Sequence, residues 1–135
     1  MSSGSAAHRG IRIDSSLWPV VHMQVFADVT EADVDVAYDE LESLVPRGRH
    51  VHLTDLRHVN PLTIPATLRK KFAERERRLA EVAEGVIMAD ARVVDHPVVR
   101  GLLTAFEWLV GDVPWPVTNH ASERAALDWL RERGF

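Results

Sequence analysis

Three histidines and one aspartate fall within nine residues of the segment that begins at His50. His50 and His52 are two residues apart, so on a β-strand their side chains point to the same face of the sheet. Such a pair binds zinc or iron only when further ligands converge on it. No second ligand pair follows at a recognised spacing, and strand alternation puts Asp55 on the opposite face unless the chain bends there. We therefore favour two partly buried strand histidines and expect no metal.

Acid–base catalysis is a second chemistry that such residues could perform, because a His–Asp pair at strand ends can act as a general base. The candidates at predicted strand ends are Asp55, His58, Asp90, Asp95 and His120. However, an aspartate just before a helix, such as Asp95, is typical of a helix cap. The sequence has no G-x-S-x-G elbow, no P-loop and no G-x-G-x-x-G motif. Without a defined nucleophile we expect a protein that is not an enzyme and uses no cofactor.

The bulk composition restricts the class of protein. The chain has 135 residues, of which 46% are hydrophobic, and a formal net charge of -4, which predicts one globular domain with no general attraction to nucleic acid. No apolar run approaches the ~18 residues that a membrane helix needs. The absence of cysteine fits a reducing compartment, so we expect a cytoplasmic protein with no membrane span. Residues 1–10, rich in Ser, Gly and Ala, are predicted to be a flexible leader, and residues 11–135 a single domain.

Hydrophobic periodicity and capping residues predict the elements that position these side chains. Thr30 and Asp33 resemble a capping box, and Thr63 and Ser122 are expected to cap later helices. Strands are predicted at 11–13, 20–27, 50–56, 85–90 and 117–120, and helices at 30–45, 63–83, 95–110 and 122–133. Strands that alternate with helices imply parallel pairing. The expected fold class is α/β, with a single mixed, mostly parallel sheet of four or five strands, an antiparallel first strand, and about four helices covering both faces.

In such a sheet, binding sites form beyond the carboxyl ends of the parallel strands. The loop that follows the strand at 50–56 has the most polar groups of the four loops at that edge. Its candidate binding residues are Asp55, Arg57, His58, Asn60 and Thr63. We expect Asp55 to fix the start of this loop by accepting backbone hydrogen bonds.

Charge is divided unevenly between the first two predicted helices. The second contains six of the sixteen basic residues within "RKKFAERERR", whereas residues 28–42 contain seven acidic residues and no basic one. The two helices could lie side by side or meet across a dimer interface. Arg75 falls on the apolar stripe of its helix, so its stem covers the core or its head projects into a pocket.

The third predicted helix is apolar around almost its whole circumference, since only Thr104 and Glu107 are polar between residues 101 and 110. The favoured interpretation is a central core helix. The alternative is a self-association surface or the wall of an apolar pocket, with Trp108 as an anchor. In that case some of the large apolar side chains of this helix should face a partner subunit, a loop or a ligand. The candidates are Leu103, Phe106, Trp108 and Val110.

Several segments together resemble one bacterial family: a strand ending in "VHLTDLRHV", a basic helix, the helix "VVRGLLTAFEWL", the segment "PWPVTNH" and the terminal "SERAALDWL". From about residue 11 onward the chain resembles the SpoIIAA-like proteins, a branch of the STAS (anti-sigma-factor-antagonist-like) and SEC14-like group. Asp55 and Leu56 match the Asp-Leu pair that precedes the recognition loop of STAS antagonists. The phosphorylatable serine of those proteins does not match, because Ile64 stands at that position and Thr63 replaces the preceding aspartate.

The resemblance implies a non-enzymatic regulatory or protein-interaction domain that makes contact with a protein partner, in the cytoplasm of a bacterium. The loop from Arg57 to Thr63 and the second helix would be the contact surface. Independently of the resemblance, the apolar circumference of the third helix favours a homodimer. The departure at Ile64 argues against a kinase-regulated switch in this loop. The SEC14-like side of the resemblance implies the alternative, a small binding module for an apolar or lipid-like ligand held between helices and sheet.

Overall fold

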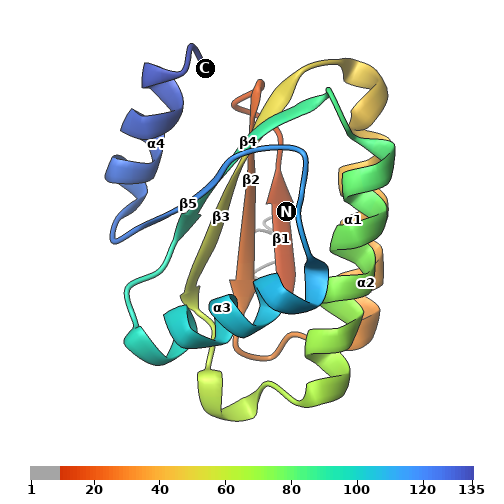
Figure 1. The fold of residues 1–135 in the computed structure, drawn as a ribbon, viewed down its shortest axis with the longest axis vertical. Helices are drawn as coiled ribbons and strands as arrows, with labels where there is room; N and C mark the ends of the chain where they lie inside the picture. Colours follow the sequence, from red (N-terminus) through yellow and green to blue (C-terminus); the bar gives the residue numbers. More distant parts are fainter. Residues whose placement is uncertain (1–9) are drawn as a thin grey trace, which may run out of the picture.

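The computed structural model describes residues 10–135. It contains five strands, four α-helices and two short 3-10 turns, η1 and η2 (Figure 1). In chain order these are β1 (Ile11–Asp14), β2 (Val20–Phe26), α1 (Glu31–Ser43), η1 (Val45–Arg47), β3 (His50–His58), η2 (Pro61–Thr63), α2 (Ala66–Val82), β4 (Ile87–Val93), α3 (Pro97–Val110), β5 (Val117–His120) and α4 (Glu123–Glu132). Of the leader predicted for residues 1–10, only Gly10 is described: it is buried, and its N–H donates to Asp28 Oδ1 at 2.8 Å.

The five strands form one mixed sheet in the order β1-β2-β3-β4-β5. β1 pairs with β2 in the antiparallel sense, and the remaining pairs are parallel. The predicted α/β class, the mostly parallel sheet and the antiparallel first strand are therefore confirmed. Each strand lies beside the next one in sequence, so every crossover advances along the sheet in the same direction.

The helices form two layers of unequal size (Figure 1). Helices α1, α2 and α3 connect successive parallel strands and cover one face, while α4 packs on the opposite face against β3, β4 and β5. Crossovers of one hand that advance in one direction must lie on one side of the sheet, which explains the grouping of the first three helices. The chain reaches the other face only after the last strand.

Each layer has its own apolar core. Beneath α1 and α2 lie buried side chains of β2 and both helices, including Val21, Met23, Tyr38, Leu41 and Leu79. Beneath α4 lie Val51, Leu53, Ala89, Ala91, Val93, Ala126 and Leu130. Most of the buried apolar residues of β3 and β4 contribute to the core beneath α4, whereas Ile87, at the start of β4, packs with the core beneath α1 and α2.

The helix starts confirm two of the predicted caps and correct two others. Thr30 and Asp33 form the predicted capping box, and Ser122 Oγ accepts from Ala125 N–H. Thr63 does not cap α2, which begins three residues later after Pro65; the proline fixes its own φ without any side-chain bond. Asp95 does not cap α3 either, because Nδ1 of His96 accepts from Val98 N–H at 3.1 Å. None of the helices in residues 10–135 is both long and apolar enough to cross a membrane.

Candidate functional site

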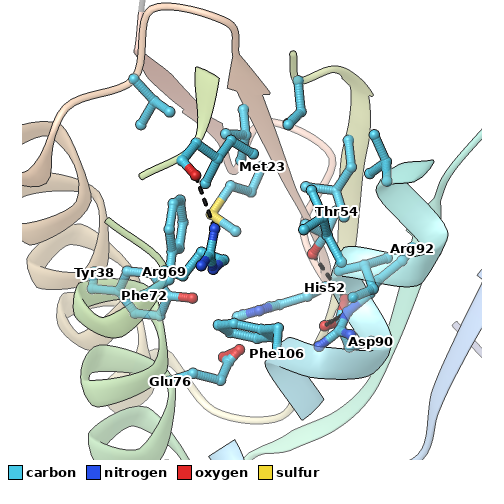
Figure 2. A pocket seen from close by; sticks show the side chains of 18 of the residues that line it. Met23, Tyr38, His52, Thr54, Arg69, Phe72, Glu76, Asp90, Arg92 and Phe106 are labelled. Carbon is cyan, nitrogen blue, oxygen red and sulfur yellow. Dashed lines mark hydrogen bonds and ion pairs between the residues drawn. The ribbon is translucent and has the colours of Figure 1, made fainter. Parts of the chain in front are cut away.

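A cavity of about 100 Å3 lies between the sheet and the three helices α1, α2 and α3. Figure 2 shows side chains from all of these layers pointing toward it. Its lining combines a large apolar wall with a smaller group of polar and ionisable side chains. The apolar wall consists of Met23, Val25, Val29, Leu41, Leu56, Val59, Ile64, Phe72, Val99, Leu102, Leu103 and Phe106, and the polar group of Tyr38, His52, Thr54, Arg69, Glu76, Asp90 and Arg92.

Part of the cavity floor is an ion pair on β4. Asp90 and Arg92 are two residues apart, so both side chains point from the strand toward the same face. Arg92 Nε lies 3.3 Å from Asp90 Oδ2, and Thr54 Oγ1 on β3 donates to Asp90 Oδ1 at 2.8 Å. Both charged residues are buried. Burial alone would lower the pKa of Arg92, but the neighbouring Asp90 and Glu76 carboxyls raise it, so the guanidinium remains charged.

Glu76 brings a second carboxyl to the same floor from α2. It is buried, and desolvation together with the nearby Asp90 raises its pKa to about 7, although Arg92 and a hydrogen bond with Tyr38 act in the opposite direction. Near neutral pH the Glu76 carboxyl therefore exists in both protonation states, one a donor and the other an acceptor only. A buried carboxyl with such a pKa inside a cavity is a common mark of a functional site.

His52 on β3 lies directly opposite Asp90 on β4, and Figure 2 shows its side chain among those that line the cavity. Burial lowers its pKa to about 4, so the ring is neutral at pH 7. Its Nε2 atom is buried and has no hydrogen-bond partner among residues 10–135. A buried polar atom without a partner costs free energy unless something else bonds to it. This atom is therefore the point in the cavity most in need of a polar group from a ligand or a water molecule.

His50 and His52 do point to the same face, as predicted, with ring centroids 5.3 Å apart. His50 Nδ1 bonds the carbonyl oxygen of Gly48 at 2.8 Å, and its ring packs against Trp18. Within residues 10–135, no group of three or more His, Asp or Glu side chains is arranged to hold a metal ion. The pair is more fully buried than expected, since both side chains are at most 4% exposed.

Arg69 supplies the remaining charge of the cavity. It comes from the first turns of α2 and lies on the side away from Asp90 and Arg92 (Figure 2). Its Nη1 donates to the carbonyl oxygen of Ile64 at 2.9 Å. Arg69, Phe72 and Glu76 are spaced at i, i+3 and i+7, so one face of α2 presents a cation, an aromatic ring and a carboxyl in succession.

Of the seven residues predicted to bind, none lines the cavity. Asp55 and Arg57 are on β3, and both side chains point to the face opposite the cavity. Strand alternation predicts this orientation for Asp55. Asp55 accepts the Arg57 N–H at 3.0 Å and two bonds from the Arg57 guanidinium at 2.9 and 2.8 Å. Burial would raise the pKa of Asp55, but these bonds hold it below its usual range. The expected backbone bond is present, and the carboxylate is largely saturated by its neighbour.

The other predicted loop residues stabilise the loop itself. His58 stacks on Phe26 with ring centroids 5.4 Å apart. Asn60 Oδ1 accepts from Leu62 N–H at 3.0 Å, and Thr63 Oγ1 donates to the carbonyl oxygen of Asn60 at 3.3 Å. All three residues are exposed. The loop thus presents these groups to solvent, outside the cavity.

Arg75 joins α2 to α1, which shows that the acidic and basic helices lie side by side within one chain. Its guanidinium contacts Asp35 at 2.9 Å, Asp39 at 2.7 Å and Glu42 at 3.2 Å. Burial would lower the pKa of Arg75, but hydrogen bonds from these carboxylates raise it. The guanidinium of Arg75 therefore belongs to an ion-pair network between α1 and α2, and it does not line the cavity.

Helix α3 is less buried than the favoured sequence interpretation required. Val99 and Val110 are its only buried residues, so the prediction of a central core helix is wrong. Leu103 and Phe106 line the cavity, whereas Trp108 is 82% exposed on the outer side. The physical reason is position: α3 contacts α2 and the η2 turn rather than lying flat on the strands. The wide apolar circumference is divided between a cavity wall and an exposed face.

Sequence reasoning missed the polar floor of the cavity. Asp90 was assigned to a strand end, and Arg92 and Glu76 were not singled out. The signal was present, because two charged residues alternate within the otherwise apolar strand "IMADARV". Charges on a strand buried on both faces must find buried partners. Glu76 gave a second signal, since it follows Phe72 by four residues and so shares its inward face.

Comparisons of the chain with family models, with curated proteins and with solved structures found no match. Function is therefore inferred from the cavity and the surface of the molecule.

Proposed function

We propose that this chain is a non-catalytic binding module whose cavity holds a small amphiphilic molecule. The observation that supports this most directly is the unpartnered Nε2 of His52 inside a cavity whose lining is mainly apolar. Ligand sites in proteins characteristically combine an apolar lining with a few placed polar groups and a residue of perturbed pKa. The Glu76 carboxyl, whose pKa is about 7, meets the last condition.

The volume limits the size of the ligand. The cavity measures about 100 Å3, somewhat less than the roughly 150 Å3 of an engineered apolar cavity that accepts benzene. A body of about one small ring, or a short branched chain, is the upper limit for the cavity as it stands. A long lipid tail would require α3 to move outward, and this helix has only two buried residues to hold it.

Native mass spectrometry of the purified protein, followed by NMR titration with small ring compounds, tests the proposal. Leu103→Trp places an indole inside the cavity, because Leu103 lines it. Leu109→Trp is the matched control on the same helix, because Leu109 is 52% exposed. We expect Leu103→Trp to lose binding by tenfold or more and Leu109→Trp to bind as wild type. Equal binding by all three proteins would place the ligand elsewhere and remove the proposal.

A second candidate is the protein contact implied by the STAS-like resemblance. Two exposed apolar side chains favour it: Leu62 in the loop from Arg57 to Thr63 is 90% exposed, and Trp108 on α3 is 82% exposed. Large apolar side chains at such positions are typical anchors of protein interfaces. The second helix contributes less to such a surface than expected, because Lys71, Arg75 and Arg78 pair with acidic residues of α1.

Self-association through α3 is the form of this contact that is simplest to test. Light scattering after size-exclusion chromatography would compare wild type with Trp108→Glu, with circular dichroism to check folding. If Trp108 is an interface anchor, the wild type should be a dimer and the variant a folded monomer, since a buried unpaired charge is strongly disfavoured. A wild type that stays monomeric at every accessible concentration contradicts self-association. The loop would then remain as the contact surface, tested separately through Leu62→Asp and partner capture.

A further inference from the structure

Arg69 differs from Lys71, Arg75 and Arg78 of the same helix in its lack of an acidic partner among residues 10–135. Arg77 shares that lack, but it is exposed, bonds the carbonyl oxygen of Leu109 and does not line the cavity. Lys71, Arg75 and Arg78 each have a carboxylate of α1 within 3.2 Å. Arg69 forms no ion pair with any residue of the described chain, 10–135; the bond it does make there uses Nη1 and goes to the carbonyl oxygen of Ile64. A guanidinium has five N–H donors, so several remain for a further acceptor. A partly buried cation in a mainly apolar cavity therefore lacks a counter-ion.

The neighbours of Arg69 in the cavity indicate what kind of group could reach it. Phe72 lies one turn further along α2, and Ile64 precedes the helix. Neither provides an acceptor beyond the Ile64 carbonyl oxygen that Arg69 already bonds. An incoming carboxylate would bind the remaining N–H groups in the paired geometry that guanidinium and carboxylate favour. Such a bond is stronger where water is partly excluded, as it is beside an apolar wall.

The opposite end of the cavity has a different character. Asp90 is already paired with Arg92, and the Glu76 carboxyl, seven residues from Arg69 and thus roughly 10 Å further along the helix axis, becomes negative above its pKa of about 7. A second anionic group placed there would meet these carboxyls without a free cation. The unpartnered Nε2 of His52 instead suits a neutral hydrogen-bonding group or none at all. The two ends of the cavity together favour a ligand that has one negative charge, placed at Arg69, and is otherwise apolar.

We propose that the ligand of this cavity is a small monocarboxylic acid with an apolar body of about one ring or one short branched chain, and that its carboxylate pairs with Arg69. This inference rests on the proposed binding function and names the chemical class of its ligand. The body lies against Phe72, Leu103 and Phe106, and the carboxylate faces the start of α2.

Two matched pairs of probes test the inference: benzoate with benzamide, and 4-methylpentanoate with its amide. Members of a pair share shape and differ in charge. Titrations at pH 7, followed by two-dimensional 1H–15N NMR, report both the affinity and the residues perturbed. We expect each carboxylate to bind about tenfold more tightly than its amide, because a charge-assisted hydrogen bond is about twice as strong as a neutral one. The perturbed amides should include those of α2 near Arg69 and of α3 near Phe106.

Variants then assign the effect to one side chain. Arg69→Met keeps the length of the apolar stem and removes the charge, so it should abolish the difference between carboxylate and amide. Arg69→Lys keeps the charge without the paired donors, so it should retain a reduced preference. Lys70→Met is the matched control, since it removes the same charge from an exposed neighbour on the same helix. The wild-type comparison of carboxylate with amide needs no variant, so a folding defect in Arg69→Met does not impair the test.

The outcomes separate this inference from the function on which it rests. If carboxylates and amides bind the cavity equally, or if Arg69→Met leaves the preference unchanged, the monocarboxylate class is wrong while the binding function stands. If the preference is lost equally in Lys70→Met, general electrostatic attraction and not Arg69 explains it, and the assignment to Arg69 fails. If none of the four probes perturbs cavity residues at millimolar concentration, the proposed binding function itself is contradicted.

Discussion

The two faces of the sheet differ in the side chains that the same two strands, β3 and β4, present to the helices above them. Facing α4, β3 and β4 present an apolar cluster beneath the helix that includes Leu53, Ala91 and Val93, and these side chains pack with Ala126 and Leu130. Facing α1, α2 and α3, the intervening residues of the same strands are His52, Thr54, Asp90 and Arg92, and a cavity lies above them. Beneath α4 the face is closed and apolar, and its buried ion pair, Asp55 with Arg57, lies at the end of β3. The other face is hollow, with its charges on the floor of the cavity.

This difference arises from the helices as much as from the strands. Helix α4 lies directly on β3, β4 and β5, whereas α3 contacts α2 and η2 and leaves room over β4. Burying an ion pair and two further ionisable groups does not increase stability relative to apolar packing. A face that retains them is better explained by binding than by folding. The proposed site therefore lies on the α1–α3 face, next to the larger of the two apolar cores.

The largest effect should come from removing the cation of the hollow face. Arg92→Met leaves Asp90 buried with Thr54 as its remaining partner, and removing one member of a buried ion pair costs about 3–5 kcal/mol. Urea unfolding at pH 8 measures this loss. Arg100→Met, on the exposed side of α3, is the control and should change the free energy of unfolding by less than about 0.5 kcal/mol. If Arg92→Met left the free energy of unfolding unchanged, the charges of this face would matter no more to stability than those of the surface.

A pH-dependent effect of intermediate size should come from Glu76. Its pKa in the folded protein is about 7, above the usual 4.5, so the folded state favours the proton-bound form. The corresponding stability is complete below pH 4.5 and is lost as the pH rises through 7. Glu76→Gln removes this loss, so its free energy of unfolding relative to wild type should rise by about 3 kcal/mol between pH 4 and pH 8.

The contribution of His52 to stability has the opposite pH dependence. Burial lowers its pKa from 6.5 to about 4, so the folded state favours the neutral ring, and this stability is lost as the pH falls from 6.5 toward 4. Wild type and Glu76→Gln share this contribution, so it cancels in their difference. Thermal or urea unfolding of the two proteins at a series of pH values provides the measurement. Parallel stability curves would show that Glu76 has an ordinary pKa and that the floor of the cavity is more hydrated than its burial indicates.

The smallest difference should separate two leucine truncations, one on each face. Leu130→Ala empties space in a closed core and should lower the free energy of unfolding by about 2–5 kcal/mol. Leu103→Ala enlarges a cavity that already exists, at a partly exposed position, and should cost about 2 kcal/mol less. Urea unfolding of both variants at one pH tests the contrast. Equal losses would mean that the hollow face is packed as tightly as the closed one.

The sequence was sufficient for the fold because periodicity and local capping determine element type. The alternation of strands and helices predicted the mostly parallel sheet, and the capping box at Thr30 and the cap at Ser122 are confirmed. The cap expected at Thr63 failed because Asn60 nucleates a separate 3-10 turn, which uses the hydroxyl of Thr63 before α2 begins. Several short polar residues near a proline offer competing local bonds.

The site was harder to predict, because its residues come from six elements, β2, α1, β3, α2, β4 and α3, and meet only after packing. Strand parity correctly placed His50 and His52 on one face, but parity does not reveal that Glu76 of α2 approaches Asp90 of β4. The loop residues from Asp55 to Thr63 attracted attention because polar residues at strand ends often form sites. Most of them instead bond one another, which sequence alone does not show.

The strand order β1-β2-β3-β4-β5 has a consequence for how the chain acquires its structure. Parallel sheets generally fold slowly when a late strand must insert between earlier ones, because long loops must close first. Here no strand is inserted, and the connections within the three β-α-β units are only 23, 28 and 23 residues long. The sheet can therefore grow from one edge in the direction of synthesis, with the α4 face completed last. Until the C-terminal helix docks, the apolar face of β3 and β4 is uncovered, so a ribosome-bound or C-terminally truncated chain should be the aggregation-prone species.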